Sequence, residues 1–350
     1  MAQHVIVGAG SVGSALALRR AESGHAVRMA TRSGAGPVHA SIERVAEATD
    51  GARLADLARG ATALHNCANP PYRRCATDWS PLSDALLLVA ERSGAVLVAT
   101  ADLYGYGPVD GAMTEDAPFA SAEGTKGAVR NRMWSDALAA HEAGRIRATE
   151  ARASDFHGPG LRDTGHVGED VVPRMLAGKR ELVMQGDLDA PHSFTHVDDV
   201  VATPATMAVD ERAWGRAWHV PTAPAVSLRE VARRIATIAG VPDRGLLVLP
   251  RAAVRIGGPA VPFLRRTGGG ALPVRRVVRS RLDRGAAHVR PGVHGSGRGP
   301  GADGGPVARA DAGLGLTPRA RATNGTLVRP DWAEGPFVRA ASRGAYGGAP

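Results

Sequence analysis

The chain has 350 residues, of which 44% are hydrophobic, and a formal net charge of +9. No apolar run approaches the length of a bilayer span, which excludes a membrane protein. Cys67 and Cys75 lack the spacing of a disulfide framework or a zinc site, so we interpret both as packing residues. The start MAQHVIVGAG has no basic region before its apolar residues, so a cytoplasmic protein is expected.

The excess positive charge lies in the last quarter of the chain. Residues 265–350 hold 15 arginines and 5 acidic residues, a net of +10, which leaves a net of −1 for residues 1–264. The same segment holds 18 of the 44 glycines and shows no sustained hydrophobic period. This distribution argues against nucleic acid as a partner.

The first 150 residues alternate short apolar strands with helical patterns, which predicts a parallel sheet flanked by helices. Strands are expected in HVIVGAG, HAVRMATR, IERVAEATD, TALHNCANP and GAVLVATADLYG, and helices in SVGSALALRRAESG and near 51–58, 81–93 and 125–143. The expected fold class is therefore α/β, a Rossmann-like doubly wound parallel sheet.

The pattern becomes mixed after a sixth expected strand in RIRATEARASDFHGPG. A helix is expected near 166–178, a short strand in ELVMQG and a helix in SLREVARRIATIAG. We expect a dinucleotide-binding domain over residues 1–155 and a smaller substrate-binding cap over 156–264. Residues 265–350 are expected to form a Gly/Arg-rich tail without a packed structure.

A dinucleotide fingerprint follows the first strand. Gly8, Gly10 and Gly13 stand in Gly-x-Gly-x-x-Gly spacing directly before a helix. In that context the glycines turn the chain, admit the pyrophosphate and pack helix on strand, and the helix N-terminus meets the phosphates. We expect Ser11 and Val12 to contact the cofactor with them.

The end of the second strand selects the form of the cofactor. An NAD site usually ends this strand with a carboxylate on the ribose, but here Thr31 and Arg32 stand there, followed by Ser33. A carboxylate repels a 2′-phosphate, whereas a hydroxyl and a guanidinium bind it. The sequence therefore favours NADP over NAD.

Several motifs in order resemble the extended short-chain dehydrogenases, also called the NAD-dependent epimerase/dehydratase family, over about residues 3–264. They are VGAGSVGSAL, EATD, HNCANPP, VATADLYGYG, ASDFHGPG and SFTHVDDVV. The resemblance implies an adenine contact for Asp50 and a cofactor-lining role for Cys67 and Ala68. It also implies catalytic roles for Thr100, at the family's Ser/Thr position, and for Tyr104.

The family's reaction uses Tyr-x-x-x-Lys on the long helix. Lys126, one of only two lysines, falls at the lysine position, where an ammonium binds the nicotinamide ribose and lowers a tyrosine pKa. Ala122 stands in place of the tyrosine. Three explanations are open: Tyr104 or Tyr106 supplies the phenol, Thr100 and water suffice, or the protein binds NADP without catalysis.

The resemblance implies NADP-dependent interconversion of a carbonyl and an alcohol on a small metabolite. The alternatives are nucleotide-sugar epimerase or dehydratase chemistry and a non-catalytic NADP-binding regulator. A small-molecule substrate is the expected partner, with a homodimer as one option for the assembly. Four histidines (His157, His192, His196 and His219) lack metal-ligand spacing, and Trp214 and Trp218 are interpreted as cap core.

The abrupt change after VPFLRR suggests that residues 265–350 are translated from the wrong reading frame. LPVRRVVRSRLDRGAAHVRPGVH, residues 272–294, can be encoded so that the DNA read one nucleotide later gives YQFDGLFVRDSTAAQRTFGPGFT. Continuing through GSGRGPGADGG, residues 295–305, gives DPGEALALTVA. This text holds an aromatic strand-like segment and a helix-like one, and it resembles how this family's chains finish. A one-base insertion or two-base deletion within about 265–271 explains it.

Overall fold

The computed structural model describes residues 1–46, 50–70, 75–107, 109, 112–122, 126–161, 172–183, 187–248 and 279–280. The elements up to the seventh strand are β1 (Gln3–Val7), α1 (Ser11–Glu22), β2 (Ala26–Thr31), β3 (Ile42–Ala46), α2 (Gly51–Leu57), β4 (Ala63–Asn66), α3 (Cys75–Ser93), β5 (Val96–Asp102), the 3-10 helix η2 (Tyr104–Tyr106), β6 (Ala112–Met113), α4 (Lys126–Glu142) and β7 (Arg147–Ala153).

The remaining elements are shorter on average. They are β8 (Asp155–His157), α5 (Val172–Leu176), β9 (Glu181–Val183), β10 (Pro191–His192), β11 (Phe194–His196), α6 (Val197–Met207), the 3-10 helix η3 (Glu211–Ala213), β12 (Ala217–His219), β13 (Val226–Ser227), α7 (Leu228–Ala239), β14 (Leu246–Val248) and β15 (Arg279–Ser280). None of the helices in the described part of the chain has both the length and the apolar character that crossing a bilayer requires.

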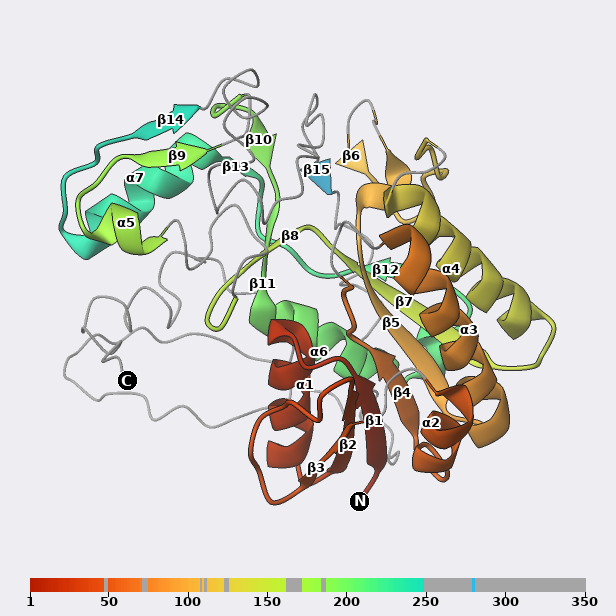
Figure 1. Ribbon diagram of the computed structural model, residues 1–350. Helices are drawn as coiled ribbons and strands as arrows, with labels where there is room; N and C mark the ends of the chain where they lie inside the picture. Colours follow the sequence, from red (N-terminus) through yellow and green to blue (C-terminus); the bar gives the residue numbers. More distant parts are fainter. Residues whose placement is uncertain are drawn as a thin grey trace, which may run out of the picture.

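The centre of the molecule is a seven-stranded sheet in the order β12-β7-β5-β4-β1-β2-β3 (Figure 1). Every pair in it is parallel. Apolar side chains of α2, α3 and α4 cover one face, and those of α1 and α6 cover the other. The doubly wound Rossmann-like fold expected from the sequence is confirmed.

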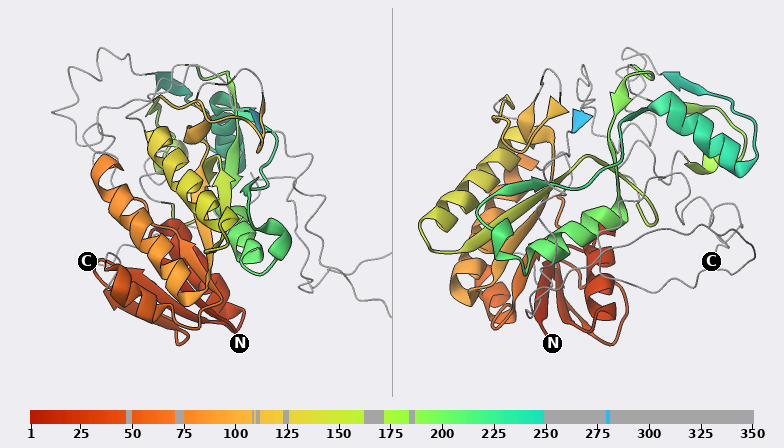
Figure 2. Two further views of the ribbon diagram at one scale, coloured as in Figure 1. Left: turned by 90° about the vertical axis from the view of Figure 1, so that its right-hand side faces the viewer. Right: turned by 180° about the vertical axis from the view of Figure 1, so that it is seen from behind.

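A smaller layer stands beside the carboxyl edge of the sheet (Figure 2). Its own apolar cluster joins α5 to α7 through Met175, Val231 and Ile235. Helix α7 begins with an N-cap serine, because the Ser227 hydroxyl accepts the Glu230 backbone N–H at 3.1 Å. It ends at Gly240, whose φ of +67° is the left-handed conformation that glycine adopts without strain.

The chain returns to the central sheet after it has entered the cap. Helix α6 packs on α1, and β12 adds the edge strand beside β7. Trp214 and Trp218 pack against the cluster under the sheet, so the cap position expected for them is wrong. The layers therefore do not divide at residue 155. The return of the chain to the sheet was hard to predict from the sequence because β12 has only three residues.

Candidate functional site

The loop after β1 has the shape that a pyrophosphate requires. Gly8 has a φ of +103°, and a Cβ there would lie 2.7 Å from the Ala68 Cα. A Cβ on Gly13 would lie 2.0 Å from the Gly8 carbonyl oxygen. At Gly10 a Cβ would meet no atom within 4 Å. Packing thus excludes side chains at the first and third glycines, and the second faces open space where a ligand can approach the backbone.

The first turn of α1 supplies positive potential to that space. Gly10 caps the helix without a side-chain hydrogen bond, and no acidic residue occupies the first turn. The N–H groups at Ser11 and Val12 therefore face the loop with the helix dipole behind them. The Ser11 hydroxyl donates to the Gly160 carbonyl at 2.5 Å, which ties the loop to the segment after β8. A dinucleotide diphosphate fits these groups.

The end of β2 has no carboxylate. Thr31 is buried, and its hydroxyl donates to the Ala35 carbonyl at 3.2 Å, closing the turn. Arg32 and Ser33 are exposed, and no ion pair joins Arg32 to a described acidic residue. The Arg32 guanidinium and the Ser33 hydroxyl therefore stand at the end of β2, where the side chains of such folds meet the 2′ position of the cofactor ribose.

Asp50 has a local structural role. It is the N-cap of α2, and its side chain accepts the N–H groups of Ala52 at 2.9 Å and Arg53 at 3.2 Å. These bonds account for the residue without a ligand. The adenine contact inferred from the resemblance stays a prediction.

The segment after β4 lies directly under the cofactor loop. A Cβ on Gly13 would come within 3.1 Å of the Cys67 Cβ, and the backbone of Ala68 touches Gly8. The Cys67 sulfur lies 3.8 Å from the Thr100 hydroxyl oxygen. Burial raises the pKa of the Cys67 thiol to about 12, so the thiol stays neutral and acts as a packing group. The side chain of Cys75 lies outside the described residues.

Tyr104 and Lys126 come from segments in direct contact. Ser121 donates its hydroxyl to the Tyr104 carbonyl at 2.6 Å, and Asn131 of α4 donates to the Gly105 carbonyl at 2.9 Å. A Cβ on Gly127 would lie 2.3 Å from the Tyr104 carbonyl oxygen. The absence of that Cβ lets the start of α4 press against η2, which brings the lysine to the end of β5. The expected helix near 125–143 is observed as α4.

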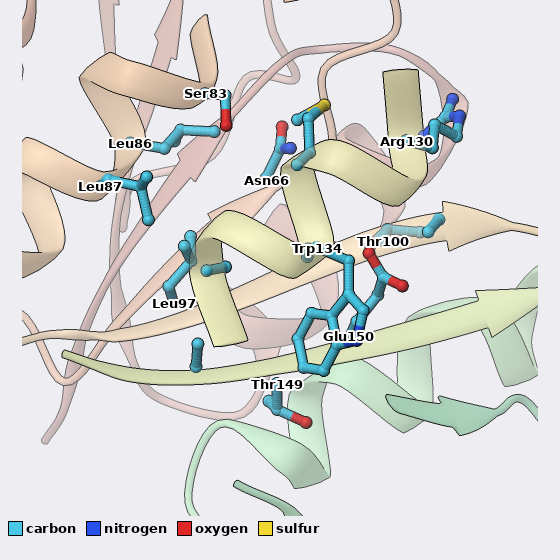
Figure 3. Close-up of a pocket in the computed structure, with 15 residues that line it drawn as sticks. Asn66, Ser83, Leu86, Leu87, Leu97, Thr100, Arg130, Trp134, Thr149 and Glu150 are labelled. Atoms are coloured by element: carbon cyan, nitrogen blue, oxygen red, sulfur yellow. The ribbon is translucent and has the colours of Figure 1, made fainter. Parts of the chain in front are cut away.

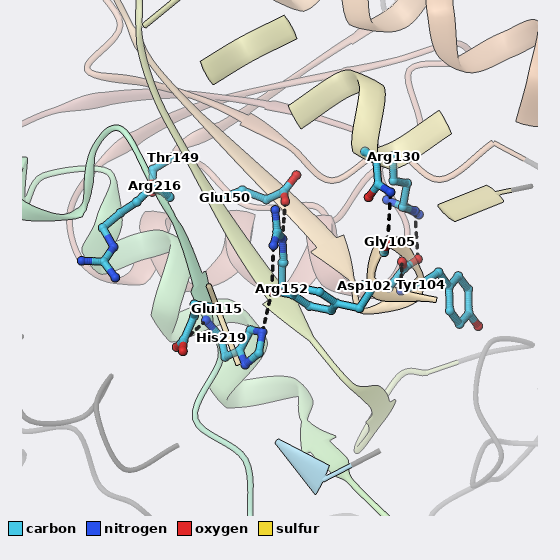
Figure 4. Close-up of polar contacts among 12 residues, drawn as sticks. Asp102, Tyr104, Gly105, Glu115, Arg130, Thr149, Glu150, Arg152, Arg216 and His219 are labelled. Atoms are coloured by element: carbon cyan, nitrogen blue, oxygen red, sulfur yellow. Dashed lines mark hydrogen bonds and ion pairs between the residues drawn. The ribbon is translucent and has the colours of Figure 1, made fainter. Parts of the chain in front are cut away.

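The turn after β5 is held by an ion pair. Asp102 accepts the Tyr104 backbone N–H at 3.1 Å with one oxygen, and its other oxygen lies 2.8 Å from the Arg130 Nε. Arg130 also donates to Asn69 at 3.2 Å, so it joins the ends of β4 and β5 to α4. Figure 4 shows the Tyr104 ring pointing away from this pair and from Arg152.

Tyr106 belongs to a buried polar network. It is 1% exposed, and its hydroxyl accepts from Arg152 Nη1 at 2.7 Å. His219 Nε2 lies 2.9 Å from the same hydroxyl oxygen, and the tautomer of the imidazole decides which of the two groups donates. Burial raises the pKa of Tyr106. The Tyr106 hydroxyl is therefore enclosed by Arg152 and His219, which favours Tyr104 over Tyr106 as the source of the expected phenol.

The charged centre of this network was not expected from the sequence. Arg152 Nε lies 2.6 Å from Glu150 Oε1, and both side chains are buried. Burial raises the pKa of Glu150, and the neighbouring guanidinium opposes the shift. Two charges spaced two apart in a strand share a face. That pattern in TEARA, within a buried strand, was the available signal.

A small cavity lies behind these residues, between the sheet and helices α3 and α4 (Figure 3). Its volume of about 30 Å³ holds no more than a water or two. Its polar lining residues are Asn66, Ser83, Thr100, Arg130, Thr149 and Glu150. The cavity is too small for a substrate. No group of three or more metal-ligating side chains occurs in the described part of the chain.

The model of the NAD dependent epimerase/dehydratase family matches residues 4–215. The chain belongs to this family. As an epimerase/dehydratase family member it is an NAD(P)-dependent oxidoreductase or epimerase/dehydratase. The family match confirms the resemblance inferred from the sequence motifs. No curated protein is significantly similar to it in sequence.

Several solved structures share the fold of this family member. UDP-glucose 4-epimerase from Thermotoga maritima, with UDP-glucose, is 17% identical with a TM-score of 0.62, covering 71% of this chain and 85% of that chain. MoeE5 in complex with UDP-glucuronic acid and NAD is 22% identical with a TM-score of 0.60, covering 73% and 92%. The dTDP-glucose 4,6-dehydratase DesIV from Streptomyces venezuelae, with NAD, is 19% identical with a TM-score of 0.59, covering 71% and 84%.

Proposed function

We propose that the protein transfers a hydride between NADP and the carbonyl or alcohol carbon of a small metabolite. The observation that carries this proposal is the open space at Gly10 beside an uncapped helix N-terminus, at the same sheet edge as Thr100 and Lys126. The bound cofactor supplies the hydride. The chain supplies the loop after β1 that binds the diphosphate, the hydroxyl of Thr100 and the ammonium of Lys126 for the nicotinamide ribose.

Discrimination for NADP rests on Arg32. Isothermal titration is expected to show NADPH binding at least about tenfold tighter than NADH, because the guanidinium pairs with the 2′-phosphate that NADH lacks. Arg32→Ala should remove that preference by weakening NADPH alone. Arg59→Ala, on an exposed arginine at the end of α2, is the matched control and should change neither affinity. Equal affinities in the unaltered protein would contradict the preference for NADP.

Lys126 is expected to contact the cofactor ribose. Lys126→Arg should weaken NADPH binding or turnover by about tenfold or more although the charge is kept, because a planar fork replaces a compact ammonium. Lys179→Arg, at the other lysine, is exposed and should leave binding unchanged. A Lys126→Arg variant that binds like the unaltered protein would contradict the ribose contact.

Nucleotide-sugar epimerase or dehydratase chemistry is the second candidate. The observation that favours it is the family match, together with similar folds solved with UDP-glucose and UDP-glucuronic acid. An epimerase or dehydratase returns the hydride, so incubation with UDP-glucose would change the sugar without net consumption of the reduced cofactor. Net oxidation of NADPH by aldehydes or ketones supports the first candidate. Cofactor binding with neither reaction supports the non-catalytic regulator.

A further inference from the structure

One guanidinium joins four segments that lie far apart in the sequence. Arg130, in α4, places its Nε 2.8 Å from Asp102 Oδ2 at the end of β5. Its Nη2 donates to Asn69 Oδ1, after β4, at 3.2 Å. The guanidinium carbon also lies 4.7 Å from the centre of the Trp79 ring of α3. These three contacts fix the guanidinium between the sheet and the two helices that cover it.

The acidic partner of Arg130 lies in the middle of the candidate catalytic segment. Asp102 follows Thr100 by two residues and precedes Tyr104 by two residues. Its second carboxylate oxygen accepts the Tyr104 backbone N–H at 3.1 Å. Figure 4 shows the Arg130 guanidinium reaching this turn. One carboxylate therefore shapes the end of β5 and holds it to α4.

Arg130 itself stands one helical turn after Lys126. The two residues are four apart in α4, so their side chains leave the same face of the helix. A contact that holds Arg130 against the end of β5 therefore also fixes where the first turn of α4 presents the lysine.

The ion pair is shielded from water. The Arg130 side chain is 16% exposed and that of Asp102 is 21% exposed. Arg132, two residues further along α4, is 81% exposed and lies 3.7 Å from Asp136. An exposed pair of the second kind is screened by solvent and contributes little, whereas a shielded pair holds its geometry more firmly. The two neighbouring arginines thus differ in what they can position.

The spacing between β5 and α4 matters for the proposed reaction. Thr100 comes from one of these segments and Lys126 from the other, and a misplacement of about 1 Å is enough to slow a reaction about a hundredfold. A different polar contact at this edge, 2.6 Å between His192 Nε2 and Asp155 Oδ2, joins β10 to β8 and touches neither segment.

We propose, resting on the dinucleotide binding proposed above, that Arg130 is a positioning residue whose ion pair with Asp102 sets the place of Lys126 at the nicotinamide ribose. Arg130 acts through the lysine and is not itself a ligand of the cofactor, because its Nε and Nη2 are engaged by Asp102 and Asn69. Its removal should therefore affect the nicotinamide half of the dinucleotide and spare the adenosine half.

Two ligands separate such a local effect from a general loss of structure. ADP carries the adenosine and the diphosphate of the cofactor and ends before the nicotinamide ribose. The second ligand is NADPH or NADH, whichever the unaltered protein binds more tightly. Isothermal titration measures the affinity of each variant for both ligands, and the ratio of the two affinities is the readout.

Asp102→Asn and Arg130→Gln are each expected to weaken dinucleotide binding by about tenfold and ADP binding by less than about twofold. In Asp102→Asn the amide oxygen can still accept the Tyr104 N–H, so only the ion pair is lost. The double variant should bind no more weakly than either single variant, because both changes remove the same pair. Arg132→Gln is the matched control and should change neither affinity.

A second cycle tests whether Arg130 acts through Lys126. Lys126→Ala removes the ammonium, so adding Arg130→Gln to it should weaken dinucleotide binding by less than about twofold more. A further tenfold loss in the double variant would overturn the positioning role, because Arg130 would then act independently of the lysine.

The outcomes separate the two proposals. An equal loss for ADP and the dinucleotide, or no loss in Asp102→Asn and Arg130→Gln, would overturn the positioning role and leave the proposed function standing. Failure of the unaltered protein to bind either dinucleotide would overturn both. Melting curves identify a variant that does not fold. Arg130→Lys then replaces it with the same expected losses, because an ammonium keeps the charge without the fork that reaches both Asp102 and Asn69.

Discussion

Lowering the pH from about 7 to about 4.5 is expected to cost the protein about 2 kcal/mol of unfolding free energy through His4 alone. His4 is fully buried in β1, and its Nδ1 lies 3.1 Å from the Nε2 of His65 in β4. Burial, with Arg20 and His25 nearby, lowers the pKa of His4 from 6.5 to about 4. Burial, with His4 and Arg20 nearby, holds the pKa of His65 well below its usual value.

The sign follows from where the proton binds. Between pH 6.5 and about 4 the unfolded chain protonates its histidines, while folded His4 stays neutral. The stabilisation is therefore complete above pH 6.5 and is lost as the pH falls through the folded pKa. His157, whose pKa burial lowers to about 3, adds a loss of the same sign that extends to lower pH.

Urea titrations at several pH values measure this effect as a slope of unfolding free energy against pH. His4→Gln should flatten the slope between pH 6.5 and about 4 whatever its effect on absolute stability, because the slope counts protons. His39→Gln, in the loop before β3, is the matched control and should keep the slope. The same slope in His4→Gln and the unaltered protein would mean that His4 protonates equally in both states.

Resequencing the gene is expected to show that the printed sequence contains a one-base insertion or a two-base deletion within the codons of about residues 265–271. We propose that the chain read one nucleotide later is the native C-terminal segment. The structure describes only Arg279–Ser280 after residue 248, and these pair with Ala112–Met113 of β6. The rest of the tail, with its expected scarcity of contacts, lies outside the described residues. The alternative reading turns VVRS, residues 277–280, into LFVR, which puts Val in place of Arg279 in this pairing and Leu and Phe directly before it.

Expression of both readings tests the frame directly. Burying two or three large apolar side chains should raise the melting temperature of the re-read chain by on the order of 10 °C over the printed chain. A chain ending at residue 264 is the control and should melt with the printed one. A confirmed printed frame, or a re-read chain that melts no higher, would leave the arginine-rich segment as the native one.

The sequence predicted the elements whose signals are local. The glycine spacing at residues 8–13 and the alternation of strands and helices identified the sheet, because each depends on neighbouring residues. The network of Tyr106, Arg152 and His219 and the pair of Asp155 and His192 could not be read that way. Their partners are 37 to 113 residues apart, and only the register of the folded strands brings them together.

The path of the chain between sheet and cap restricts how the protein can be re-engineered. The backbone leaves the sheet after β7, contributes α5 to the cap, returns as α6 and β12, and leaves again into α7. A chimera that exchanges the cap must therefore replace two separate segments and keep the stretch between them. Exchange at a single junction would carry away an edge strand and a supporting helix. The cap is accordingly easier to alter by point changes in α5 and α7 than by transplanting it as one module.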